Sequence, residues 1–161
     1  MKTIIFEKLL EKASDINELK AYDISDPYNV AALTILALEL YARNKDEGIK
    51  AINILKGPQP LSGYEISFLN DRFMDKDYVP RSYFEGSTSD NNYQPNLPYT
   101  ISIYEDSYTY QEENYAKLNV QSSGADLKRP IKLRVKDGQW YLWEQMILSG
   151  IKEPKSYDPW S

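Results

Sequence analysis

The segment 130–148 constrains the fold more than any other part of the chain. Two runs of alternating apolar and polar residues, 130–136 and 139–148, are separated only by Asp137-Gly138. An Asp-Gly pair between such runs is typical of a two-residue β-hairpin turn, and that turn fixes which residues face each other. We expect Val135 opposite Trp140, Leu133 opposite Leu142 and Ile131 opposite Glu144 on one face, with Arg134 opposite Tyr141 and Lys132 opposite Trp143 on the other.

The same alternation extends to two earlier runs, Tyr99–Tyr104 and Asn114–Ser122, which predicts an antiparallel sheet of about four strands. Apolar side chains should share one face of this sheet and pack on a second layer. The other face then collects cations and aromatic rings. Its members, called the basic–aromatic face below, are Tyr115, Lys117, Lys132, Arg134, Tyr141 and Trp143.

A surface of this kind suits an anionic or planar partner, because cations and aromatic rings together recognise such groups. Two alternatives stay open. One is an ordinary solvated sheet face, in which cross-strand aromatic–cation pairs only stabilise the hairpin. The other is partial cover of the face by another segment of the chain or by a second subunit, the latter as a homodimer with a symmetric contact of Tyr141 and Trp143.

Helical patterns dominate the first half of the chain. Asp26-Pro27 is a typical helix start, and the residues after it are apolar almost all round, which predicts a central core helix. Gly57-Pro58 ends another helix, and Ser62 with Glu65 forms a capping-box pattern at the start of a third. Apolar spacing adds one helix near the N-terminus. The four predicted helices cover 3–13, about 27–41, about 46–56 and about 63–73.

These patterns predict an α+β domain in which an N-terminal layer of about four helices packs on one face of a C-terminal antiparallel sheet of about four strands. The 161 residues suit a single domain. Its parts are a helical part (1–77), a loop (78–98), the sheet (99–148) and an irregular tail (149–161).

The loop 78–98 is rich in proline, asparagine and tyrosine, and the sequence leaves open whether it is ordered or mobile. Within it, 81–93 has the composition of a sugar- or peptide-binding loop, with Arg81, Tyr83 and Asn92 as candidate binding residues. The alternative is a structural loop anchored by its aromatic side chains.

Composition excludes several kinds of chemistry. The chain has no cysteine and no histidine, so thiolate and imidazole nucleophiles and the usual zinc sites are absent. We predict no metal and no cofactor. Strand alternation places Glu144 on the core face, where a carboxylate needs a partner such as Arg129. Structural pairing is the simpler interpretation, and an acid with a raised pKa there is the one catalytic candidate.

The charge balance disfavours nucleic acid as a partner, since 24 acidic residues against 19 basic ones give a net charge of −5. The longest nearly apolar run, Val30–Leu38, is too short to span a bilayer, and the first ten residues do not resemble a signal peptide. We therefore expect no membrane association and a cytoplasmic location.

Several long segments resemble an uncharacterised bacterial family, a domain of unknown function found mainly in clostridia-like Firmicutes. The matching segments are DPYNVAALTILAL (26–38), LKGPQPLSGYE (55–65), PRSYFEG (80–86), NNYQP (91–95), ENYAKLNVQSSGAD (113–126), RPIKLR (129–134) and GQWYLWE (138–144). The resemblance covers about residues 26–160 and implies no known activity. A weaker, architectural similarity is to cystatin-like or NTF2-like domains, in which a bent sheet wraps a long helix.

These observations favour a non-enzymatic binding or interaction module that uses the basic–aromatic face and the 81–93 loop. Its partner would be a protein or a small anionic, aromatic or sugar ligand. The alternative is a small-molecule-binding or hydrolytic enzyme of the NTF2-like kind, with carboxylate or tyrosine chemistry in a pocket. A deep pocket that contains Glu144 would favour the enzyme, and a shallow aromatic–basic face would favour the module.

Overall fold

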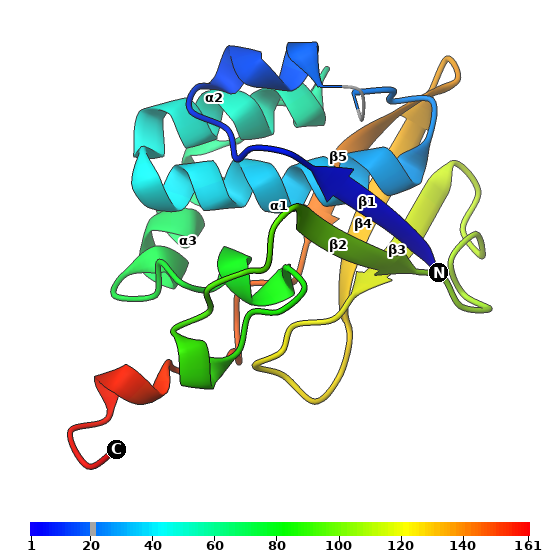
Figure 1. The fold of residues 1–161 in the computed structure, drawn as a ribbon. Coiled ribbons are helices and arrows are strands. Elements are labelled where there is room, and N and C mark those ends of the chain that lie inside the picture. Colours follow the sequence, from blue (N-terminus) through cyan, green and yellow to red (C-terminus); the bar gives the residue numbers. More distant parts are fainter. Residues whose placement is uncertain (20–21) are drawn as a thin grey trace.

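Helix α1 (Pro27–Arg43) occupies the centre of the molecule (Figure 1). In this computed structural model, which describes residues 1–19 and 22–161, the Asp26 side chain caps the helix by accepting a 2.9 Å hydrogen bond from the Tyr28 N–H. Every residue from Val30 to Tyr41 is buried, as the apolar pattern predicts. Within the described residues, no helix is both long and apolar enough to cross a membrane.

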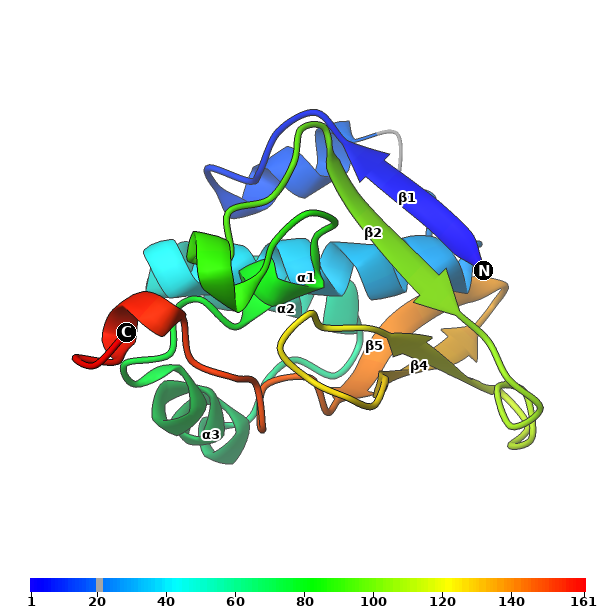
Figure 2. The same ribbon diagram turned by 60° about the horizontal axis from the view of Figure 1, so that its bottom comes forward.

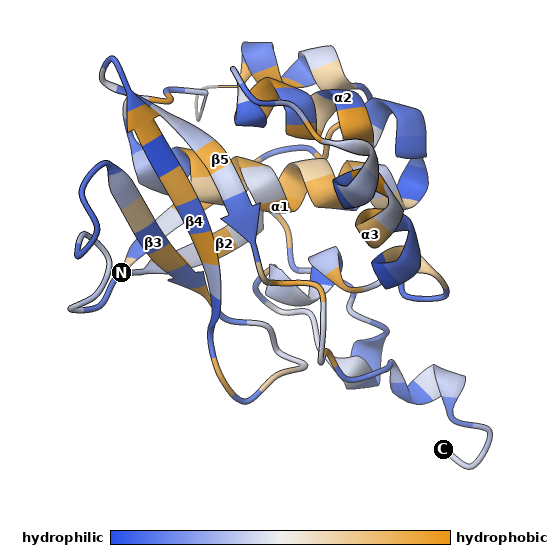
Figure 3. Ribbon diagram, turned by 180° about the vertical axis from the view of Figure 1, so that it is seen from behind, coloured by the Kyte–Doolittle hydropathy of each residue, from blue (hydrophilic) through white to orange (hydrophobic). Residues whose placement is uncertain are grey.

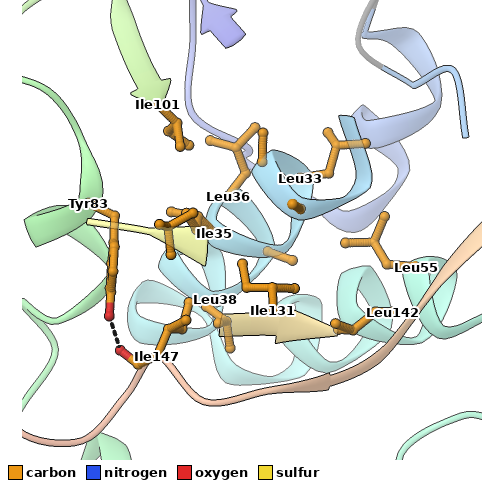
Figure 4. Packing of buried hydrophobic residues seen from close by; sticks show 14 of the residues in the cluster. Leu33, Ile35, Leu36, Leu38, Leu55, Tyr83, Ile101, Ile131, Leu142 and Ile147 are labelled. Carbon is orange, nitrogen blue, oxygen red and sulfur yellow. Dashed lines mark hydrogen bonds between the residues drawn. The ribbon is translucent and has the colours of Figure 1, made fainter. Parts of the chain in front are cut away.

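A five-stranded antiparallel sheet curls around α1, which contacts all five strands (Figure 2). Strands β2 and β3 are paired only at Ile103–Val120 and Tyr104–Asn119, so they diverge beyond that end and allow the sheet to curl. The apolar face packs on α1 as expected (Figure 4). In chain order and in sheet order, the strands are β1 (Lys2–Phe6), β2 (Tyr99–Tyr104), β3 (Tyr115–Val120), β4 (Arg129–Lys136) and β5 (Gln139–Gln145).

The prediction of a helix over 3–13 is wrong, and so is the prediction of about four strands. Residues Lys2–Phe6 form β1, which pairs antiparallel with β2 along its whole length. Ile4 and Phe6 are buried while Ile5 is 57% exposed, so the segment follows the two-residue period of a strand. A 3-10 helix, Ala13–Glu18, follows it. The N-terminal part is therefore not purely helical.

The other two predicted helices are confirmed. Helix α2 spans Lys45–Lys56 and packs along α1, and α3 spans Gly63–Phe73 with the capping box formed by Ser62 and Glu65. Leu69 is the buried residue of α3. A hydrogen bond from the Tyr41 hydroxyl to Asn70 also attaches α3 to α1.

The loop 78–98 fills the space where β2 and β3 separate. The Glu85 N–H donates to the Thr100 carbonyl at 2.9 Å, and the Ser123 N–H donates to the Ser82 carbonyl at 3.0 Å. The buried Tyr83 hydroxyl donates to the Ile147 carbonyl at 2.5 Å (Figure 4). These bonds join the loop to β2 and to the segments that follow β3 and β5.

Candidate functional site

The β4–β5 hairpin follows the predicted register only near its turn. Asp137 and Gly138 both have positive φ, at 53° and 77°, as a type I′ turn requires. The pairs Val135–Trp140, Arg134–Tyr141 and Leu133–Leu142 are confirmed. The pairing then shifts, so that Lys132 lies opposite Glu144 and Ile131 opposite Gln145. Trp143 is the extra residue of a β-bulge, and the two predicted pairs beyond Leu142 are wrong.

The bulge also overturns the placement of Glu144. A one-residue shift moves a side chain to the opposite face of a strand, and Glu144 is exposed instead of lying on the core face. Its expected partner Arg129 donates instead to the carbonyl groups of Leu127 and Gly150. The physical basis for regarding Glu144 as a desolvated catalytic acid is therefore lost.

The basic–aromatic face forms on the outer side of β3, β4 and β5, which Figure 3 shows in front of α1. The rings of Tyr115 and Trp143 meet edge to face with centroids 5.5 Å apart. The Arg134 guanidinium lies 5.1 Å from the Trp143 ring and 5.3 Å from the Tyr115 ring, and it donates a 3.0 Å hydrogen bond to the Tyr115 hydroxyl. These contacts hold Arg134 in one position against two rings.

The two central cations of this face differ in their ion pairing. Lys132 donates a 2.7 Å hydrogen bond to the Glu112 carboxylate, and this bond raises the pKa of Lys132. Arg134 is exposed, and within the described residues no carboxylate lies within 4 Å of its guanidinium. Lys117, opposite Lys132 on β3, is also exposed. Arg134 is thus a fixed cation that is open to an external anion.

A cavity of about 560 Å³, the outer cavity, lies between the turn after α2 and the outer side of the β4–β5 hairpin. Arg134, Lys136, Tyr141 and Trp143 contribute to it from the sheet. The turn approaches very closely here: a Cβ on Gly57 would lie 2.3 Å from a ring carbon of Tyr141, and the φ of Gly57 is +61°. Glycine is therefore required for the turn to cover Tyr141 in this way.

The Lys56–Glu65 pair forms the inner wall of the outer cavity. The Lys56 side chain is only 6% exposed, and its ammonium donates to the Trp143 carbonyl at 3.2 Å and to Glu65 at 3.4 Å. Burial raises the pKa of the Glu65 carboxyl, but the hydrogen bond from the Ser62 N–H and the charge of Lys56 together lower it below its usual value. The Glu65 carboxyl is accordingly charged at neutral pH.

Lys56 is not among the predicted site residues. It follows Ile52 by four residues, and this spacing alone predicts that Lys56 lies on the buried face of α2. A charged residue at such a position requires a partner, and here the partners are Glu65 and the backbone of the bulge. Lys136 belongs to the outer cavity as well, although only Lys132 and Arg134 were selected from β4.

A second cavity of about 240 Å³, the inner cavity, is also lined by this ion pair. Its wall is mainly apolar and comes from α1, α2, α3 and β5, with Leu38, Ile52 and Leu69 among its residues. Tyr64 and Phe68, which also line it, are 82% and 39% exposed. The two cavities share Lys56, Glu65 and Leu142.

The predicted loop residues do not join either cavity. Arg81 donates to the carbonyl groups of Tyr93 and Asn92, at 3.3 and 3.5 Å. The Asn92 side chain accepts a hydrogen bond from Ser156 of the C-terminal tail at 3.4 Å. The Tyr83 side chain is 3% exposed. Tyr83 is thus buried, Arg81 is half-buried and bonded within the loop, and the exposed Asn92 contacts the C-terminal tail.

Comparison with known proteins assigns the chain to a family. The model described as "Domain of unknown function (DUF6935)" matches residues 8–155. The chain belongs to this family. The DUF6935 match includes α1–α3 and β2–β5, and hence both cavities, and it begins earlier than the predicted limit at residue 26. The comparison found no similar curated protein and no similar solved structure.

Proposed function

We propose that the protein is a non-enzymatic binding module that takes a small planar anion into the outer cavity, against the basic–aromatic face. The observation that carries this proposal is Arg134, which is held against Tyr115 and Trp143 but has no carboxylate partner among the described residues. A guanidinium accepts a carboxylate through two parallel hydrogen bonds, and the neighbouring rings offer a flat apolar surface to a planar group.

The charges around the outer cavity support an anion. Its wall contains three cations, Lys56, Arg134 and Lys136, and one carboxylate, Glu65. Glu65 is already paired with Lys56, so the remaining charge of the cavity is positive. This local excess occurs in a chain whose net charge is −5. Such a patch attracts small anions, whereas the acidic remainder of the surface repels nucleic acid and anionic membranes.

The proposal uses the basic–aromatic face alone and leaves the 81–93 loop a structural role, because Tyr83 is buried and Arg81 is bonded within the loop. Glu144 lines the inner cavity, but it is exposed and lies opposite Lys132, so it lacks the desolvation that a catalytic acid would need; we therefore favour binding over hydrolysis. We also propose, from the sequence patterns alone, that the protein is of bacterial, clostridia-type origin and is located in the cytoplasm. The curled sheet around α1 supports the weaker resemblance to cystatin-like domains.

The test uses benzoate as the planar anion and benzamide as its neutral counterpart. The indole N–H resonance of Trp143, assigned with a Trp143→Phe variant, is followed by NMR during titration of the full chain. We expect benzoate to bind with a dissociation constant on the order of 1 mM, because a ligand of this size has few contacts to make. Benzamide should bind at least tenfold more weakly, since it lacks the charge that Arg134 recognises.

Two matched variants decide whether Arg134 is responsible. Arg134→Gln should weaken benzoate binding at least tenfold. Lys128→Gln removes the same charge from a cation that lies 4.7 Å from the ring of Tyr104, away from the outer cavity, and should leave benzoate binding unchanged. Equal effects of the two variants, or equal binding of benzoate and benzamide, would refute the proposal. A protein that sediments as a dimer until Trp143 is replaced would support the homodimer instead.

A further inference from the structure

We infer that the ligand of the outer cavity is an amphipathic anion, whose charged planar head lies against Arg134 and whose short apolar tail occupies the inner cavity. This inference rests on the proposed function and specifies its ligand class. The observation behind it is that the two cavities share three lining residues, Lys56, Glu65 and Leu142.

The shared wall permits one molecule to use both cavities. Leu142 is apolar and contributes to both, and the four-carbon stem of Lys56 adds apolar surface beside it. The Lys56–Glu65 hydrogen bond is long, at 3.4 Å, whereas the bond from Lys56 to the Trp143 carbonyl is 3.2 Å. We place the tail along Leu142 and the stem of Lys56, because both residues line both cavities.

The inner cavity has a suitable size and lining for an apolar tail. A cavity of roughly 150 Å³ lined by leucine, isoleucine and phenylalanine is known to hold benzene. The inner cavity measures about 240 Å³ and has Leu38, Ile52 and Leu69 in its wall. A chain of about four carbons or a single ring fits this space.

Charge fixes the orientation of such a ligand. The inner cavity is lined by two carboxylates, Glu65 and Glu144, and by one cation, Lys56. The outer cavity has three cations and one carboxylate. An anionic head is therefore repelled from the inner cavity and attracted to the outer one, so the apolar end must enter first.

The exposed rings of α3 favour the same occupant. Tyr64 and Phe68 are four residues apart, so they lie on one side of α3, where both line the inner cavity. Exposed aromatic surface gains free energy when an apolar group covers it. A bound tail would cover part of these rings.

A peptide strand added to the edge of β5 is a less suitable occupant. The Trp140 N–H, which points away from β4, already donates to the Ile24 carbonyl at 2.6 Å. Lys56 occupies the Trp143 carbonyl. Edge pairing is thus blocked on both sides of Leu142, which leaves space for a small molecule and not for an extended chain.

The experiment compares benzoate with 4-butylbenzoate on the full chain, by the same NMR titration. Burial of one methylene group tightens binding by roughly threefold to fourfold, so the tail should tighten it about tenfold if two of its carbons are buried and roughly a hundredfold or more if all four are. Contacts between the butyl protons and the methyl groups of Leu69 should be detected in the wild-type protein. Resonances of the inner cavity should shift with 4-butylbenzoate and not with benzoate.

A cavity-filling variant provides the control. Leu61 lines the inner cavity only and is half-buried, so Leu61→Trp should remove the advantage of the butyl group and preserve benzoate binding. Leu127→Trp makes the same change at a residue that is 73% exposed and outside both cavities, and should preserve both affinities.

The outcomes distinguish failure of the proposed anion binding from failure of the amphipathic ligand alone. Absence of benzoate binding would refute the proposed function itself. Benzoate binding that the butyl group improves by less than twofold, or butyl contacts away from Leu69, would refute the amphipathic ligand alone. The contacts between the butyl group and Leu69 in the wild-type protein test the amphipathic ligand even if Leu61→Trp does not fold.

Discussion

Replacement of Gly48 by alanine should destabilise the protein, although a glycine-to-alanine change within a helix usually stabilises that helix. Gly48 lies in α2 where this helix crosses α1, and a Cβ added to it would lie 2.2 Å from the Cα and 2.6 Å from the N of Tyr41. Helix propensity favours alanine over glycine by about 1 kcal/mol. Overpacking costs about 1–3 kcal/mol, and the upper value applies because the atoms that collide are backbone atoms of the central helix. The net loss in the free energy of unfolding is then about 2 kcal/mol.

Thermal unfolding followed by circular dichroism measures this effect. A loss of about 2 kcal/mol should lower the Tm by roughly 4–8 °C in a domain of this size. The matched control is Gly63→Ala at the start of α3, where an added Cβ meets no atom within 4 Å. That variant should unfold at the wild-type temperature or slightly above. A Gly48→Ala protein as stable as Gly63→Ala would refute the close packing of α1 against α2.

Three further predictions concern buried or paired groups. Tyr83→Phe should cost about 1–2 kcal/mol in urea unfolding, because the Ile147 carbonyl loses its 2.5 Å hydrogen bond inside the protein; an unchanged midpoint would contradict this. The pKa of Glu65 is lower than its usual 4.5, so its contribution to stability is present above that pH and lost as the pH falls through the lower folded-state value. The Tm of Glu65→Gln should consequently fall less than that of the wild type between about pH 5 and pH 3. An equal fall in Tm for both proteins would contradict the pairing of Glu65 with Lys56. Burial raises the pKa of Tyr78 from 10.0 to about 12. The contribution of the protonated Tyr78 to the free energy of unfolding is therefore complete below pH 10.0 and is lost as the pH rises towards about 12. Tyr78→Phe should therefore withstand alkaline unfolding better than the wild type over that range.

The elements that local patterns define were predictable from the sequence. Asp26-Pro27 and Ser62 with Glu65 specify helix starts by hydrogen bonds within a single turn, and α1 and α3 begin there. The Asp137-Gly138 turn likewise fixes the three pairs nearest to it. Each of these features depends on atoms close together in the chain, so one sequence is sufficient to read them.

Strand β1 could not be recognised in this way. Ile4 and Phe6 point to the core because β1 pairs with β2, almost 100 residues later, at positions such as Ile4–Ile101. The segment is short, and its apolar residues also fit a helical spacing together with Leu9 and Leu10. Only the distant partner strand decides between the two periods.

The candidate site depends on long-range contacts even more strongly. Turn chemistry controls the hairpin register as far as Leu142, but the bulge at Trp143 occurs where Lys56, 87 residues earlier, donates to the Trp143 carbonyl. Lys56 can be buried there because Glu65 balances its charge. The same ion pair lines both cavities, and the shift in register moves Glu144 from the predicted core face to the surface. The register shift thus occurs beside a contact between α2 and β5 and leaves Glu144 exposed, and the proposed binding function rests on the cations and rings of the outer cavity.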